Sequence, residues 1–233
     1  MKKYLSAVRY FDPFERCLWF GSVIVVLMSF FAFGGANALL ITSSLVGVTS
    51  LIFNAKGNPI GQALMVIFSI MYGVISFELR YYGEMITYVG MTMPMAIVAL
   101  ISWVRNPYNG KKSQVKIDRV STRGYIVMAI SSLIVTAIFF FILRYFNTAH
   151  LLISTISVTT SFIAVYFTFK RSKLYAIAYA MNDVVLIILW SLASLENRSY
   201  LSVTACFCAF LANDIYGFVS WRKMEIRQKN GTS

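Results

Sequence analysis

Two Asn-Asp pairs lie inside long apolar stretches of the chain and have the residue types best suited to chemistry there. They are Asn182-Asp183 and Asn213-Asp214. At 1.5 Å per residue, the first pair lies about 14 Å from the start of its stretch and the second about 12 Å from the end of its own. Neither depth holds a Lys or Arg, so the carboxyl groups must be neutral, be capped by hydroxyl and amide donors, or bind a cation. The simpler alternative is that both pairs only bind neighbouring helices together.

Each pair belongs to a polar and aromatic face on a helical projection. The first face holds Tyr175, Tyr179, Asn182, Asp183 and Trp190, and the second holds Ser202, Cys206, Asn213, Tyr216 and Ser220. Such faces predict a cavity between helices. Weaker candidates for the other wall of this cavity are Gln62 and Tyr72 on one helix, and Glu84 and Pro94 on the next. The predicted substrate-binding residues are Asn182, Asp183, Asn213, Asp214, Tyr179, Trp190, Gln62 and Tyr72.

Eight apolar runs must position these residues. The 233-residue chain is 58% hydrophobic and 13% charged, with a mean hydropathy of +0.70, which is more apolar surface than a soluble domain can bury. In lipid the backbone must satisfy its own hydrogen bonds, and long unbroken runs select helices over a barrel. We therefore expect an all-α polytopic membrane protein with eight transmembrane helices, over residues 16–34, 36–54, 59–78, 82–104, 124–145, 148–169, 173–193 and 199–221.

The basic residues test this count. Of the 21 Lys and Arg residues, only Arg80, Arg144 and Arg198 fall on one side of the predicted membrane. Lys and Arg in short loops accumulate on the cytoplasmic side, so the pattern predicts a multi-pass protein of the bacterial inner membrane with both termini in the cytoplasm. The net charge of +12 is dispersed over loops and ends, which excludes a nucleic-acid-binding face. Trp103 and Trp221, beside basic residues, are expected to anchor helix ends at the interface.

Metal and cofactor chemistry is not expected. Cys206 and Cys208 fall on different helix faces, and His150, the only histidine, falls at a helix end in a predicted loop. No Ser-His or Cys-His constellation is predicted at membrane depth, so we expect no enzyme. An intramembrane aspartyl enzyme built on Asp183 and Asp214 is the alternative class, although no protease motif surrounds them. A receptor or structural membrane protein is a third class.

The chain also repeats itself. Residues 42–48 match residues 159–165 at an offset of 117, and Ser102-Trp103 matches Ser220-Trp221 at 118. Corresponding helices are four apart, so the repeats run in parallel, as in SWEET-like transporters. We expect a 3+1+3 core of two parallel triple-helix bundles behind an additional N-terminal helix. The predicted parts are the cytoplasmic N-terminus with the first helix (1–35), a first bundle (36–104), a basic loop with a connector helix (105–147), a second bundle (148–222) and a basic cytoplasmic tail (223–233).

Several motifs resemble the PnuC family of bacterial nicotinamide riboside transporters. They are Ala55-Lys56-Gly57-Asn58, Tyr81-Tyr82-Gly83-Glu84-Met85, Met93-Pro94-Met95 and the closing segment from Asn213 to Arg222. The resemblance covers about residues 36–224 and implies the same 3+1+3 core, facilitated diffusion of the riboside, its phosphorylation by a cytoplasmic riboside kinase, and a homotrimer. The chain departs from the family pattern at Ala176 and Tyr179, where the family often carries tryptophans, and at Ala96, where it often carries glutamine.

The residue types suit the ligand that this resemblance implies. Nicotinamide riboside carries a permanent pyridinium cation on a sugar rich in hydroxyl groups. Aromatic faces attract such a cation, a carboxylate balances it, and Asn or Gln can bind its hydroxyl groups. Thiamine would satisfy the charge argument equally, and a deoxynucleoside would need stacking and hydrogen bonds without charge, so these substrates remain open.

Overall fold

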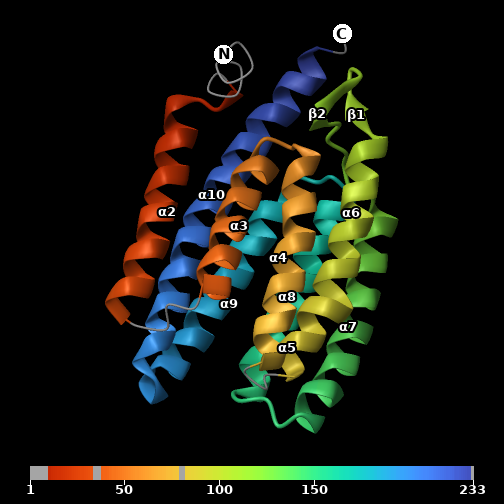
Figure 1. Ribbon diagram of the computed structural model, residues 1–233. Helices are drawn as coiled ribbons and strands as arrows, with labels where there is room; N and C mark the ends of the chain where they lie inside the picture. The colour runs from red at the N-terminus through yellow and green to blue at the C-terminus, as the bar shows by residue number, and fades with distance from the viewer. Residues whose placement is uncertain (1–9, 34–37, 79–81, 232–233) are drawn as a thin grey trace.

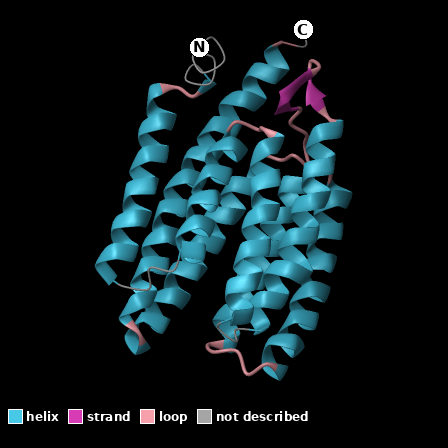
Figure 2. Ribbon diagram, viewed as in Figure 1, coloured by secondary structure: helices cyan, strands magenta, loops and turns pink. Residues whose placement is uncertain are grey.

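The computed structural model describes residues 10–33, 38–78 and 82–231, and it is almost entirely helical (Figures 1 and 2). The described residues contain eight helical segments long and apolar enough to cross a membrane, which confirms the predicted count. Arg80 and Tyr81, used in the sequence argument, lie outside the described residues. The segments are α2 (Pro13–Phe33), α3 (Ala38–Ala55), α4 (Pro59–Glu78), a fourth composite helix, α7 (Thr122–Tyr145), α8 (Leu151–Phe169), α9 (Leu174–Glu196) and α10 (Leu201–Asn230).

The fourth segment is interrupted next to Pro94. It consists of α5 (Tyr82–Ile86), a π-helical stretch η1 (Thr87–Thr92) and α6 (Met93–Arg105). The backbone N–H of Met93 donates to the carbonyl of Tyr88, five residues earlier, and Pro94 has no N–H to continue the α-helical pattern. The helix is therefore interrupted before Pro94 by a widened turn, and Tyr88 in this turn lies against Tyr72 of α4.

The packing divides into two triplets that exchange contacts. Within the first triplet α4 packs against both α3 and α6, and within the second α9 packs against both α8 and α10. Between triplets, α10 packs on α3 and α6 packs on α8, so the last helix of each triplet contacts the first helix of the other. α7 covers α8, while α2 lies along α10 and α3. This is the expected arrangement of one added helix and two triplets joined by a connector.

Both described ends of the chain lie at one end of the bundle, together with a small hairpin (Figure 1). This end, here called the basic end, also holds the α3–α4 and α8–α9 turns with their lysines and arginines. The opposite end, here called the far end, holds the loops after α7 and α9, where Arg144 and Arg198 lie. The predicted separation of charge therefore appears in the fold.

Two features of the basic end were not predicted. Strands β1 (Pro107–Tyr108) and β2 (Lys111–Val115) form an antiparallel hairpin through Asn109 and Gly110, whose φ angles are +48° and +73°. Asn-Gly is the sequence that tolerates such a turn. In addition, α10 continues to Asn230 instead of ending near residue 221, because Gln228 donates to the carbonyl of Val115 and accepts from the N–H of Ile117.

Candidate functional site

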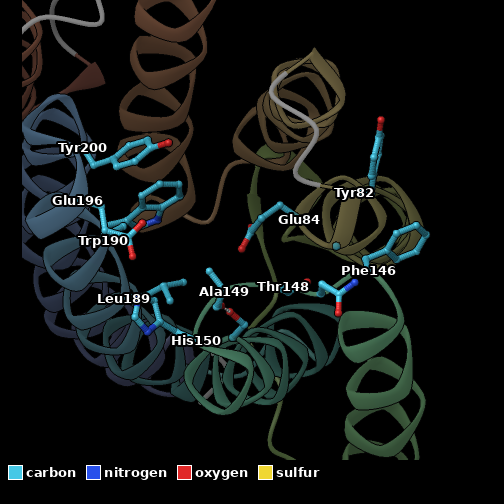
Figure 3. A pocket seen from close by; sticks show the side chains of 14 residues that line it. Tyr82, Glu84, Phe146, Thr148, Ala149, His150, Leu189, Trp190, Glu196 and Tyr200 are labelled. Atoms are coloured by element: carbon cyan, nitrogen blue, oxygen red, sulfur yellow. Dashed lines mark hydrogen bonds between the residues drawn. The ribbon is translucent and has the colours of Figure 1, made fainter.

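A cavity of about 270 Å³ opens at the far end between α5 of the first triplet and α9 of the second (Figure 3). Glu84 reaches into it from α5, and Glu196 and Trp190 face it from α9. No lysine or arginine is among its described lining residues. The cavity is therefore acidic and aromatic. Its lining residues are Tyr82, Gly83, Glu84, Phe146, Asn147, Thr148, Ala149, His150, Ser154, Leu189, Trp190, Ala193, Glu196 and Tyr200.

The loop between α7 and α8 forms one wall of this far-end cavity. Asn147 and His150 in this loop have φ angles of +50° and +51°, which ordinary side chains adopt only at a cost. The loop lies so close to α5 that a Cβ atom on Gly83 would come within 2.5 Å of the Thr148 hydroxyl oxygen. Gly83 thus permits the approach that brings Glu84 to the wall. Across the cavity, the rings of Trp190 and Tyr200 lie 5.4 Å apart between centroids.

An aromatic layer lies in the core between the triplets. The Tyr72 ring is 4.8 Å from Phe68 and 5.0 Å from Tyr88, measured between centroids. The partly buried Trp190 packs against the same core cluster. The predicted residue Tyr72 is therefore in the core between the triplets, next to the π-helical stretch.

A polar layer is found one to two turns further along α9. Asp183 lies seven residues before Trp190, about 10 Å along the helix axis. The carboxyl groups of Asp183 and Asp214 are both buried and lie close enough to interact with each other. Two carboxylates so placed repel each other, which favours a proton on one of the two groups. Oδ2 of Asp183 is buried without a partner among the described residues, so an acceptor remains available inside the protein.

Asn182 completes this polar layer. Its side-chain oxygen accepts hydrogen bonds from Thr160 (2.8 Å) and Ser161 (3.0 Å) on α8, with Ser157 at 3.5 Å. No described residue accepts from its amide nitrogen, so the N–H groups are free to donate to a ligand. Tyr179, three residues nearer the basic end than Asn182, is half-buried beside Tyr175, with ring centroids 6.2 Å apart. The structure thus brings Asn182, Asp183, Asp214 and Tyr179 to neighbouring depths.

Two predicted site residues lie elsewhere. The amide of Asn213 donates to Ser22 on α2 (2.8 Å) and to the carbonyl of Ala209 (2.8 Å). Tyr216 makes a second hydrogen bond between α10 and α2, because its hydroxyl group donates to Glu15 (2.7 Å). Asn213 and Tyr216 of the second predicted polar face therefore contact the added helix, whereas Cys206 of the same face packs in the core cluster with Tyr72. Gln62 donates to Asn54 at the basic end (2.8 Å), far from the polar layer.

Two tryptophans close the interface between the triplets at the basic end. The indole N–H of Trp103, on α6, donates to the carbonyl of Thr168 on α8, and that of Trp221, on α10, donates to the carbonyl of Asn54 on α3; both distances are 2.8 Å. Both side chains are fully buried, and their ring centroids are 5.3 Å apart. The expectation that they anchor helix ends in the interface is wrong, because the repeat directs each indole into the opposite triplet.

The sequence argument did not identify three further participants. Glu196 and Tyr200 belong to a helix end and its following turn, where exposed polar residues carry no signal of a cavity. Tyr88 reaches the core only because of the π-helical stretch. Thr160 on α8 bonds back to its own helix and also donates to Asn182, and the match of residues 159–165 with residues 42–48 was the signal available in the sequence.

Comparisons with known proteins agree with this architecture. A solved structure described as the vitamin B3 transporter PnuC matches with a TM-score of 0.79 at 19% identity, covering 94% of each chain, which shows the shared fold. A nicotinamide riboside transporter PnuC of Neisseria mucosa is 20% identical over 213 residues, which cover 90% of this chain and 81% of that protein. The family model for nicotinamide mononucleotide transporters matches residues 37–223, both triplets and the connector included. The chain belongs to the nicotinamide mononucleotide transporter family.

Proposed function

We propose that the protein carries nicotinamide riboside across the bacterial inner membrane, along the path between the two triplets. The basic end faces the cytoplasm in this proposal, with both termini, because Lys and Arg collect there. Trp190 and Glu84 lie at the entry, and Asn182, Asp183, Asp214, Tyr179 and Tyr72 line the path further in. Asn213 and Gln62, which bind other protein groups, support the helices.

The observation that carries this choice of substrate is the lining of the far-end cavity. It contains Glu84, Glu196 and the Trp190–Tyr200 pair, and no lysine or arginine among its described residues. Carboxylates beside aromatic rings attract a pyridinium cation. The phosphate of a mononucleotide would meet two carboxylates and, among the described lining residues, no lysine or arginine, although the family takes its name from that compound. The riboside therefore fits this cavity better than its phosphorylated form.

Transport is facilitated diffusion in this proposal. No coupling ion is part of this proposal, and a cytoplasmic riboside kinase would keep the inward gradient by phosphorylating the arriving substrate. A homotrimer is the expected assembly, as the family resemblance implies. Two neighbouring buried aspartates such as Asp183 and Asp214 are also what an aspartyl enzyme would need, so a peptide-cleavage assay on the purified protein tests that alternative and should show no turnover.

Flux into proteoliposomes tests the function. Labelled nicotinamide riboside should equilibrate across the membrane without any ion gradient, while labelled mononucleotide should stay outside. Unlabelled thiamine and a deoxynucleoside, added as competitors, show how far charge and ring shape decide entry. Accumulation above equilibrium after a pH or sodium step would contradict facilitated diffusion, and entry of the mononucleotide at an equal rate would contradict the substrate assignment.

A further inference from the structure

The two groups of carboxylates between the triplets differ in how their charges are used. Asp183 and Asp214 are buried close to each other in the polar layer, where their mutual repulsion favours a proton on one of them. Glu84 and Glu196 form no ion pair or hydrogen bond with any described residue, and both line the far-end cavity. The charge that an incoming cation meets is therefore the charge of these two glutamates.

The same cavity offers a surface for an aromatic ring. Trp190 and Tyr200 lie on the side of Glu196, their ring planes inclined by 53°, and Glu84 points toward them from the opposite triplet (Figure 3). A planar cation between these walls would place its face on an aromatic ring and its charge near two carboxylates. The volume of about 270 Å³ suits a single-ring compound and is small for a larger solute.

We propose that the far-end cavity is a separate capture site for a single-ring aromatic cation, and that Glu84 and Glu196 select the charge of the solute there, before it reaches the polar layer about 10 Å further along α9. This inference rests on the proposed function, since it assigns one step of that transport to these residues. In this proposal Glu84 and Glu196 recognise the charge of the solute, and Asp183 and Asp214 do not. The ribose is not needed for capture, so a pyridinium ring alone should bind.

Binding of N-methylnicotinamide, a permanent pyridinium cation without ribose, tests this site directly. Pyridinium compounds quench indole fluorescence, and the chain has four tryptophans, of which Trp190 lines the cavity. Wild-type protein should show saturable quenching, and Trp190→Phe should lose that saturable part. Neutral nicotinamide, which has the same ring, should bind more weakly.

The charge variants decide the assignment. The double variant E84Q/E196Q should weaken N-methylnicotinamide binding by roughly fivefold or more and should leave nicotinamide binding unchanged. E84D/E196D, which keeps both charges, should bind the cation nearly as wild type does. Glu78 provides the matched control. It is an exposed carboxylate where α4 ends at the far end of the bundle, and it does not line the cavity, so E78Q should have no effect.

The outcomes separate the two proposals. If E84Q/E196Q, or each single variant where the double variant does not fold, keeps the full preference for the cation, the capture site is refuted. An equal loss in E78Q would also refute it, because the effect would then be a general surface charge. If wild-type protein binds the pyridinium cation at Trp190 but does not move nicotinamide riboside into liposomes, the proposed function fails while the cation site stands.

Discussion

The two ends of the interface between the triplets are built from corresponding helices, yet they differ in how they are closed. At the basic end, Trp103 and Trp221 each donate across the interface to a backbone carbonyl, and both are fully buried. At the far end the interface opens into a cavity with two carboxylates and no such exchange among its described residues. A parallel repeat therefore provides symmetry at one end only, and access is decided by the few side chains that break that symmetry.

The largest expected effect comes from weakening the closed end. Trp221→Phe keeps an aromatic ring but removes the N–H group, which leaves the buried carbonyl of Asn54 without its partner at a cost of about 1 to 3 kcal/mol. That cost should raise the population of the state open at the basic end by roughly tenfold or more. The measurement is the rate at which a thiol reagent labels a cysteine introduced at the buried Ala176.

Trp19→Phe is the matched control for this prediction. Its indole N–H also donates a hydrogen bond, to Thr49 at 3.1 Å, but this bond joins α2 to α3 and does not cross between triplets. Labelling of Ala176→Cys should stay slow in this variant. Equal acceleration in both variants would mean that the tryptophans contribute only general stability.

The two predicted asparagines provide the next test, because the structure assigns them to different regions. Asn182→Leu removes the amide donors of the polar layer, takes away the acceptor of the Ser161 hydroxyl group, and should weaken riboside binding roughly tenfold. Asn213→Leu breaks the contact of α10 with Ser22 on the added helix, so it should lower thermal stability while affinity stays unchanged. Titration calorimetry and thermal unfolding of both variants would show the reverse pattern if the placement is wrong.

These asparagines also show what the sequence can and cannot predict. The eight helices follow from apolar length, and the structure confirms their number. The separation of charge and the repeat follow from basic loops and a constant offset, and the packing is consistent with both. The polar face around Asn213 was predicted to border a cavity, but a helical projection does not say which neighbour covers it. α2 precedes the repeat, so no internal comparison could place it against α10.

The cavity was predicted only in part for a related reason. Trp190 and Glu84 could be named because an aromatic and a carboxylate at helix ends stand out in apolar surroundings. Glu196 joins them only through the approach of the 146–150 loop to Gly83, which depends on tertiary packing. The positions of Trp103 and Trp221 led to a wrong prediction. Both lie close to arginines, which is typical of interface anchors, and nothing in that pattern indicates that their indole groups donate into the opposite triplet.

The smallest expected effect concerns the ion pairs that brace the basic end. Glu225, on the part of α10 that continues past Trp221, contacts Lys173 (2.7 Å), Lys229 (2.9 Å) and Arg119 (3.3 Å). Hydrogen bonds from these basic partners lower the pKa of Glu225 from 4.5 to about 2. The bond from Lys173 contributes most, and the bond from Lys229 contributes next. Because the basic partners are largely exposed, Glu225→Gln should cost only about 1 kcal/mol of unfolding free energy near neutral pH.

The stabilising contribution of Glu225 should decrease at low pH. A carboxyl group whose pKa is lower in the folded state stabilises the fold at pH values above its ordinary pKa, and the contribution is lost as the pH falls from 4.5 toward 2. The difference in melting temperature between wild type and Glu225→Gln should therefore be constant from pH 8 to about pH 5 and shrink below that. A difference that does not shrink at all between pH 5 and pH 3 would show that the side chain acts through packing.

A disulfide across the closed end tests the account most directly. A Cβ atom on Gly217 of α10 would lie 3.9 Å from that of Ala55 on α3, within the range for a disulfide between the two triplets. Gly73 and Val89 offer the same 3.9 Å separation inside the first triplet and serve as the matched control. Both pairs would be introduced into a chain whose Cys17, Cys206 and Cys208 are replaced by alanine, with Gly217→Cys alone as a further control, since its side chain would approach Tyr175.

Riboside equilibration into proteoliposomes is then measured before and after reduction. If solute leaves by separation of the triplets at the basic end, oxidised Ala55→Cys/Gly217→Cys should transport nothing and regain its rate on reduction, while oxidised Gly73→Cys/Val89→Cys should transport throughout. Undiminished transport by the fully oxidised Ala55–Gly217 variant would contradict the account, because the path could not then run through the end that the two tryptophans close.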